Sequence, residues 1–121
     1  MTASPSMRTD RRPPHDEGAE QAVLSAMMLD RAAIVTAREA LIPECFYREA
    51  HRRVYQAILA VEDRGAVPDP VSLADELRRR EELHAVGGMD YLGQLIDAVP
   101  TAANVAHHAA IVRQHAQRRV V

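Results

Sequence analysis

The chain has 121 residues, enough for one domain whose core needs no disulfide or metal. It contains one Phe, three Tyr, no Trp and few Gly or Pro, and this composition is typical of an all-helical fold. All 15 basic residues are Arg, which excludes every mechanism that needs a lysine, such as a P-loop or a Schiff base. The net charge of −2 indicates that the chain lacks the excess of positive charge that tight binding to duplex DNA needs. Because Cys45 is the single cysteine, an internal disulfide is excluded.

Targeting and membrane signals are absent from the sequence. The chain does not open with a charged segment followed by an apolar run. No apolar stretch approaches the roughly 18 residues that are needed to cross a bilayer. We therefore expect a cytoplasmic protein with no membrane partner.

The N-terminal part of the chain predicts a leader and two helices. Residues 1–14 lack apolar periodicity and are expected to form a flexible leader. Asp16 is a candidate N-cap for a first helix, and Asp30 starts a second one that Pro43 closes. The apolar residues of the first helix repeat at helical spacing and are Ala19, Ala22, Val23, Ala26 and Met27.

The middle of the chain predicts two further helices. The segment 48–64 has the clearest amphipathic pattern, and Gly65 is expected to end it in the left-handed conformation. Asp69 and Pro70 are typical of the N-cap and first position of a helix, which runs to about Arg80. The core is expected to centre on the helix over 48–64 and to contain Phe46, Val54, Ile58, Val61, Leu77, Leu92 and Leu95.

The C-terminal part predicts a short helix and then a longer one. Gly87-Gly88 marks a turn before the short helix, Pro100 ends it, and Thr101 is expected to cap the last helix. The expected fold is all-α: a compact bundle of about five short helices over 15–99, followed by a longer C-terminal helix over 100–121.

The last helix carries a seam of small apolar residues at heptad spacing, formed by Val105, Ala109, Val112 and Ala116. The sequence leaves three explanations of this seam open. The helix folds back on the earlier helices, it packs on another chain, or its partner helix lies beyond the given sequence. A helix of about 18 residues needs tertiary or quaternary burial. We therefore expect it to pair with its equivalent in another chain or to fray beyond about Val112. The expected interface consists of this seam and of three further residues of the same helix, His108, Ile111 and His115.

No group of residues predicts an active site, a metal site or a cofactor site. His108 and His115 lie roughly 10 Å apart along the helix axis, too far to share a zinc ion. Arg78–Arg80 are interpreted as a solvated run at a helix C-terminus, with a phosphate contact as the alternative. Cys45 is interpreted as a small buried residue, and His51 as a residue that is hydrogen-bonded within the fold.

Five stretches of the chain carry motifs that occur together in one family. They are PPHDEGAEQAVLSAMMLD (13–30), CFYREAHRRVYQAI (45–58), GAVPDPVSLADELRRREEL (65–83), VGGMDYLGQLI (86–96) and VPTAANVAHHAAIVRQHAQRR (99–119). The most specific features are FY with the following His51, the GG-x-x-YL turn and the P-T-A-A-N cap. In their order and spacing these stretches resemble the N-terminal domain of the bacterial hexameric replicative DNA helicase, the DnaB type.

This resemblance implies a domain without chemistry of its own. In the family, six copies form the N-terminal collar of the helicase ring, helical hairpins pair between subunits and help to bind primase, and loading factors act on the same assembly. ATP, magnesium and most DNA contacts belong to a C-terminal motor domain of the parent helicase. A second hairpin helix follows the last helix in relatives, so this chain is expected to end within a truncated hairpin and to be inactive as an ATPase.

Two other classes of function stay open. One is a free-standing helical DNA-binding or adaptor module that uses Arg78–Arg80 together with Arg113, Arg118 and Arg119. Strongly salt-dependent DNA binding would favour it. The other is a small enzyme with an unrecognised carboxylate or histidine site, which a deep pocket with converging titratable groups would favour.

Overall fold

The computed structural model describes residues 13–120, and these residues form seven α-helices and one short 3-10 helix, with no strand. The elements are α2 (Glu17–Leu29), α3 (Arg31–Ala40), η1 (Pro43–Cys45), α4 (Glu49–Asp63), α5 (Pro70–Arg79), α6 (Leu83–Val86), α7 (Gly88–Ile96) and α8 (Val105–Val120). The predicted all-α class is confirmed. Most of the expected leader, residues 1–12, lies outside the described residues.

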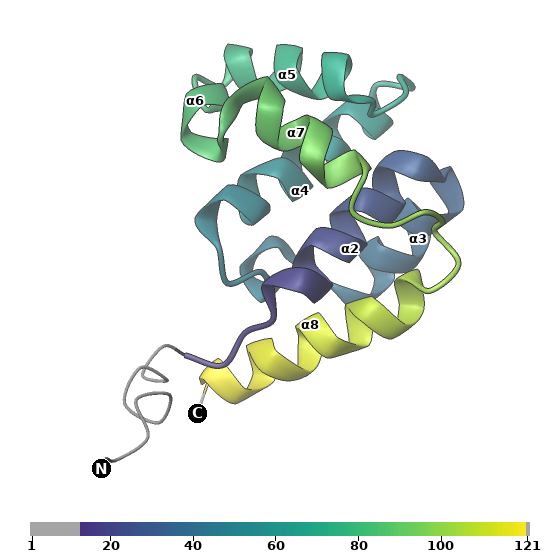
Figure 1. The fold of residues 1–121 in the computed structure, drawn as a ribbon, viewed down its shortest axis with the longest axis vertical. Helices are drawn as coiled ribbons and strands as arrows, with labels where there is room; N and C mark the ends of the chain where they lie inside the picture. Colours follow the sequence, from purple (N-terminus) through teal and green to yellow (C-terminus); the bar gives the residue numbers. More distant parts are fainter. Residues whose placement is uncertain (1–12, 121) are drawn as a thin grey trace.

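The helices lie in three groups along the molecule (Figure 1). Helices α5, α6 and α7 lie together at one end, α8 lies at the other, and α2, α3 and α4 lie between them. Helix α2 contacts α3, α4, α7 and α8. Because neighbours surround it, α2 is buried along most of its length and around most of its circumference, not only along the predicted stripe.

Aspartates begin three of the helices. The side chains of Asp16, Asp30 and Asp69 each accept a hydrogen bond from a backbone N–H of the first helical turn, at 2.8–2.9 Å. Such N–H groups have no partner inside the helix, so each cap stabilises its helix by about 1 kcal/mol. The predicted caps Asp16 and Asp69, and Pro70 at the first position of α5, are confirmed.

The turns of the structure agree in part with those predicted from the sequence. Gly65 follows α4 with φ of 81°, as predicted. Gly87 has φ of 112°, and a Cβ atom built there would lie 2.7 Å from the Cβ atom of Tyr91. Both the backbone angle and the close approach therefore require glycine at this position. The four-residue helix α6 was not predicted, because so short a segment carries no readable periodicity.

The start of the last helix differs from the prediction. Thr101 was expected to cap it, but α8 begins only at Val105. The Thr101 hydroxyl instead accepts a hydrogen bond from the N–H of Ala103 at 3.2 Å, within the turn that precedes the helix. The predicted cap is wrong because the chain makes this extra turn before it becomes helical.

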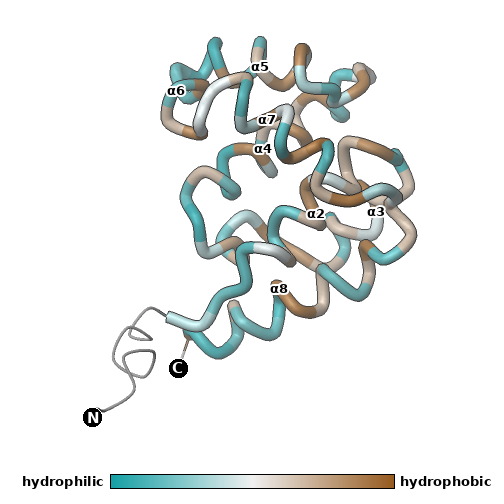
Figure 2. The backbone as a smooth tube through the Cα atoms, viewed as in Figure 1, coloured by the Kyte–Doolittle hydropathy of each residue, from teal (hydrophilic) through white to brown (hydrophobic). Residues whose placement is uncertain are grey.

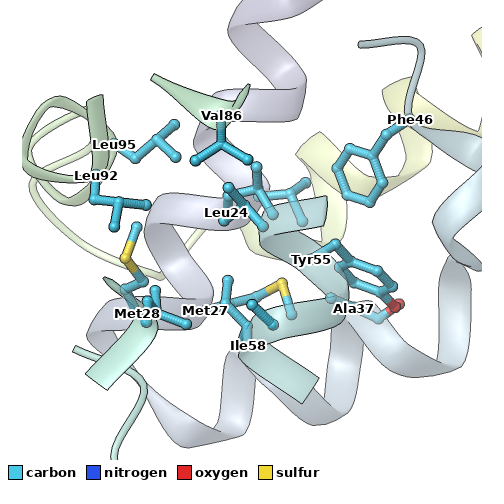
Figure 3. Packing of buried hydrophobic residues seen from close by; sticks show 14 of the residues in the cluster. Leu24, Met27, Met28, Ala37, Phe46, Tyr55, Ile58, Val86, Leu92 and Leu95 are labelled. Carbon is cyan, nitrogen blue, oxygen red and sulfur yellow. The ribbon is translucent and has the colours of Figure 1, made fainter. Parts of the chain in front are cut away.

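The hydrophobic core lies between α2 and α4 and is closed by α5 and α7 (Figure 3). Tyr55 packs against Phe46 with ring centroids 5.0 Å apart, and its hydroxyl donates to the carbonyl oxygen of Leu41 at 2.8 Å. Burial raises the pKa of Tyr55 to about 12. Every predicted core residue is confirmed, with at most 1% exposure: Phe46, Val54, Ile58, Val61, Leu77, Leu92 and Leu95.

Candidate functional site

Helix α8 packs lengthwise against the rest of its own chain (Figure 1). Its neighbours are α2, α3 and η1. Three residues of the predicted seam, Val105, Ala109 and Val112, are buried against them. The expectation that this seam needs a helix of another chain is therefore wrong, because the small seam residues let α8 approach its own domain closely. These three side chains cannot reach a partner without unpacking the domain.

The C-terminal end of α8 is held by Arg119. Its guanidinium group donates to the carbonyl oxygens of Pro14 at 2.8 Å and Cys45 at 2.7 Å. It also lies over the ring of Tyr47, 5.5 Å from the centroid, and His15 stacks on the same ring. The predicted fraying beyond Val112 is wrong for this reason, and α8 is helical up to Val120.

The other four predicted interface residues lie at the margins of the contact between α8 and its domain. Ile111 packs against the core from the side, and His108 and His115 are half-buried. Ala116 is also half-buried and lines a surface hollow. A role for these four residues in contacts with another chain stays a prediction.

The hollow beside Ala116 lies between η1 and the last turns of α8. It has a volume of about 210 Å³ and is lined chiefly by apolar groups of Ile42, Cys45, Ala116 and Val120. Ile42 is 62% exposed and Val120 84% exposed, so large apolar side chains stand open to solvent on both walls. Cys45 is half-buried at the hollow and packs against the core, so its interpretation as a small buried residue is confirmed only in part.

A second depression adjoins this hollow along α8. It is lined by Ala40, Ala106, Ala110 and Gln114, and it shares Arg113 and Gln117 with the hollow. We name the exposed residues Ala106, Ala110, Arg113, Gln114 and Gln117 the outer face of α8. This face was not predicted from the sequence, because it consists of small, amide and basic residues and carries no apolar stripe.

The last helix carries basic but no acidic side chains. Residues 98–121 contain no Asp or Glu, and the C-terminal half of α8 is hydrophilic (Figure 2). Arg113 and Arg118 are exposed, and neither forms an ion pair with another described residue. The outer face of α8 therefore presents positive charge without a carboxylate on the same helix to offset it.

The basic run at the end of α5 is in a different situation. Arg79 contacts Asp75 at 3.2 Å, and Arg80 contacts Glu76 at 2.7 Å. Arg64 at the end of α4 contacts the same Glu76 at 2.6 Å. The hydrogen bond with Arg80, followed by the one with Arg64, holds the pKa of Glu76 below its ordinary value. Carboxylates thus offset most of this run, which weakens it as a phosphate-binding site.

A chain of buried polar groups joins α2, α4 and α7. His51, which has no exposed surface, lies 2.6 Å from Glu20 through Nδ1 and 2.6 Å from the Tyr91 hydroxyl through Nε2. Gln21 donates to the same hydroxyl at 3.1 Å, and the N–H of Tyr47 donates to Glu20 at 2.6 Å. The prediction that His51 is hydrogen-bonded within the fold is confirmed.

This polar chain resembles a catalytic relay only in its residue types. Its central histidine is sealed from solvent, and each ring nitrogen already has a partner. A general base needs a substrate proton within hydrogen-bond reach. The network therefore holds α2, α4 and α7 together, along with Tyr47 in the segment that precedes α4. Sequence analysis missed Glu20 and Tyr91 as its partners, since they are 31 and 40 residues from His51.

Among residues 13–120, no three His, Cys, Asp or Glu side chains are grouped so that they could hold a metal ion. No helix in the described part of the chain has the length and apolar character needed to cross a membrane.

The structure thus defines an all-helical domain with a sealed polar network and an open basic helix face. A family model described as the DnaB-like helicase N terminal domain matches residues 12–114. The chain therefore belongs to the family of DnaB-like helicase N-terminal domains. The resemblance of the sequence motifs to this family is confirmed.

Individual relatives agree with this assignment. The chain is 52% identical to the replicative DNA helicase DnaB of Geobacillus stearothermophilus over 106 residues, covering 88% of this chain and 23% of that protein. The corresponding helicase of Mycobacterium leprae is 47% identical over 115 residues, covering 95% of this chain and 19% of that protein. The chain therefore spans about a fifth to a quarter of the length of these curated relatives.

A solved structure shows the same fold. The crystal structure of the N-terminal domain of DnaB helicase from Mycobacterium tuberculosis superposes with a TM-score of 0.87 at 48% sequence identity. The match covers 89% of this chain and 75% of that one. The agreement extends to the all-helical architecture that the composition predicted.

Proposed function

We propose that this chain is the N-terminal collar domain of a replicative DNA helicase, where it mediates assembly of the ring and docking of primase and of a helicase loader. The observation that carries the proposal is the 52% identity over 88% of the chain with a replicative helicase. In this proposal the parent protein is an ATP-dependent helicase of the bacterial cytoplasm. Its ATP, magnesium and most DNA contacts belong to a motor domain outside this sequence.

The physical character of the domain supports a role in assembly and docking. Its one buried histidine network is closed to any substrate. The sequence contains no lysine that could reach a nucleotide phosphate. The outer face of α8 and the apolar hollow beside it are open on the surface. Exposed apolar patches of this kind are typical of protein-interaction sites.

A free-standing DNA-binding or adaptor module is the second candidate, and the exposed Arg113 and Arg118 are the observation in its favour. The slightly negative net charge and the ion pairs of Arg79 and Arg80 count against tight DNA binding. Of the four Phe and Tyr residues, Phe46 and Tyr55 are fully buried, so only the half-buried Tyr47 and Tyr91 are left for base stacking. We therefore expect weak binding to single-stranded DNA at physiological salt.

The test combines two measurements on the 121-residue chain. Sedimentation across a range of concentrations measures self-association, and surface binding measures capture of a bacterial primase. The proposal expects primase capture with reversible self-association, and it expects no heat of binding when Mg-ATP is titrated into the chain. A strictly monomeric chain that ignores primase, or one that binds Mg-ATP with micromolar affinity, would overturn the assignment.

A further inference from the structure

A further hollow lies at the corner where α2 ends and α3 begins, and we call it the corner hollow (Figure 1). Val67 and Pro68, from the segment 64–69 between α4 and α5, also line it. We propose that the corner hollow binds a segment of a partner protein, which inserts one large aliphatic side chain and places an arginine or lysine beside Asp30. This inference goes beyond the proposed function and does not depend on it.

The lining of the corner hollow is chiefly apolar. Met27, Met28 and Ile34 are each at most 7% exposed, so they form the floor of the hollow and belong to the core. Leu29 and Val67 stand at its rim and are 43% and 62% exposed. Methionine side chains are flexible and polarizable, so they adapt to an inserted group. The hollow therefore offers apolar contacts from below and from the side.

The size of the corner hollow favours a single side chain over a small-molecule ligand. Its volume is about 200 Å³, whereas ligand pockets usually hold about 300–1,000 Å³. The wall formed by residues 64–69 is already ordered. The N–H of Ala66 donates to the carbonyl oxygen of Val61 at 3.1 Å, and the N–H of Asp69 donates to that of Val67 at 2.8 Å. A preformed wall lowers the entropy cost of binding.

Charge at the rim determines the sign of the partner. Oδ1 of Asp30 accepts a hydrogen bond from the N–H of Ala32 at 2.9 Å, and this exposed carboxylate forms no ion pair with another described residue. The neighbouring Arg31 is already neutralised, because its Nε donates to both carboxylate oxygens of Glu62 at 3.1 Å. The rim thus presents a carboxylate without an ion pair, which attracts arginine or lysine and repels an acidic group.

A larger hollow adjoins the corner hollow and determines how the partner segment continues. The two hollows share Leu29 and Asp30, and the larger one is lined beyond them by residues 100–103. Its lining combines polar groups with small side chains such as Ala102. A segment that crosses Leu29 therefore continues with small polar residues and needs no second large apolar anchor.

A second copy of this corner is a poor occupant. Two copies that meet across a two-fold axis would place their Asp30 carboxylates near each other, and like charges oppose association. Arg31 is able to neutralise the Asp30 of the other copy only by giving up Glu62. A partner segment that brings its own cation needs no such exchange.

The experiment titrates a short synthetic peptide into the 121-residue chain and follows the backbone amide signals by NMR. The probe contains one leucine next to an arginine, followed by serines. One control peptide has glutamate in place of arginine, and another has serine in place of leucine. The peptide thus carries the anchor, the cation and the polar continuation, and each control removes one of the first two.

Two pairs of chain variants locate the site. Asp30→Asn removes the charge and keeps the helix cap, because asparagine caps about as well as aspartate. Asp16→Asn is its matched control, since Asp16 caps α2 in the same way, roughly 20 Å away along that helix. Val67→Ser shortens the apolar rim, and Val35→Ser makes the same change at a position of α3 that is 58% exposed and outside the hollow.

We expect the probe to bind with a dissociation constant of about 1 mM or less and to shift the amide signals of residues 29–31 and 67–69. Serine in place of leucine should weaken binding at least about tenfold, because the apolar contact is lost. Asp30→Asn and Val67→Ser should each weaken binding about threefold. Their matched controls should leave it unchanged.

Thermal unfolding checks the fold of each variant, and the exposed Val67 keeps the test valid if Asp30→Asn proves unstable. No shift changes at the corner, equal binding of the glutamate peptide, or equal effects within both variant pairs would each overturn the inference. Self-association that Val67→Ser abolishes would assign the corner to a second copy and would also overturn it. A chain that binds the probe but neither captures primase nor self-associates would contradict only the collar role.

Discussion

His51 has no exposed surface, and each of its ring nitrogens has a hydrogen-bond partner. The chemistry of the Glu20 partner indicates which group donates at Nδ1. A carboxylate only accepts hydrogen bonds, so Nδ1 of His51 carries the proton that is donated to Glu20. In the neutral imidazole, Nε2 then accepts from the Tyr91 hydroxyl, which in turn accepts from Gln21. Every member of the chain has a partner, as buried polar groups require.

Removal of the Tyr91 hydroxyl tests this arrangement. Tyr91→Phe leaves Nε2 of His51 without a donor in a sealed site, so we expect the free energy of unfolding to fall by about 1–3 kcal/mol. Tyr47→Phe is the matched control, because its hydroxyl forms no hydrogen bond with a described residue. It should change stability by less than about 0.5 kcal/mol. Urea denaturation measures both, and equal effects would show that the polar chain contributes nothing.

At the scale of single elements, two glycines at α7 respond differently to an added side chain: Gly87, just before the helix, and Gly93, inside it. Gly87 has φ of 112°, and a Cβ atom there meets Tyr91 at 2.7 Å. Gly93 lies inside the helix with open space where its Cβ atom would be. We expect Gly87→Ala to destabilise the protein by more than about 1 kcal/mol and Gly93→Ala to stabilise it by up to about 1 kcal/mol. Thermal unfolding of the two variants should therefore shift in opposite directions.

The junction of α4 and α5 predicts a dependence of stability on pH. Folding lowers the pKa of Glu76 from its ordinary value of 4.5, chiefly through the hydrogen bond with Arg80 and also through Arg64. The unfolded chain therefore binds this proton more readily than the folded protein. The resulting stabilisation is present above pH 4.5 and is lost as the pH falls through the lowered pKa. Glu76→Gln should flatten the stability of the protein against pH in this acidic window, as measured by urea denaturation at each pH.

The whole molecule unfolds as one unit if α8 belongs to the core, as its burial indicates. Val112 is 2% exposed and lies in the same cluster as the residues of α4. Val112→Asp would bury a carboxylate without a partner, so we expect a loss of several kcal/mol and unfolding of the entire domain. Val120→Asp, at a position that is 84% exposed, should leave the fold intact. Circular dichroism checks both, and a stable Val112→Asp monomer would show that α8 is dispensable.

The core of the domain was more predictable from the sequence than its surface. The helical class, the caps at Asp16 and Asp69, and the core around Val54 and Ile58 were predictable, because each follows from neighbours within about one or two turns. The hollow beside Ala116 was not, since Ile42 and Val120 are far apart in the sequence and meet only after folding. The same holds for the clasp of Arg119 on Pro14 and Cys45.

The sequence by itself determined the longer helices, the caps at Asp16 and Asp69, the centre of the core and, through five ordered motifs, the family to which the chain belongs. These properties are local, because helical periodicity and capping act over a few residues. Only the tertiary structure decided what covers the seam of α8. A stripe of small apolar residues has the same pattern whether it packs on its own domain or on another chain. The choice depends on whether α2 and α3 present a complementary surface, and they do.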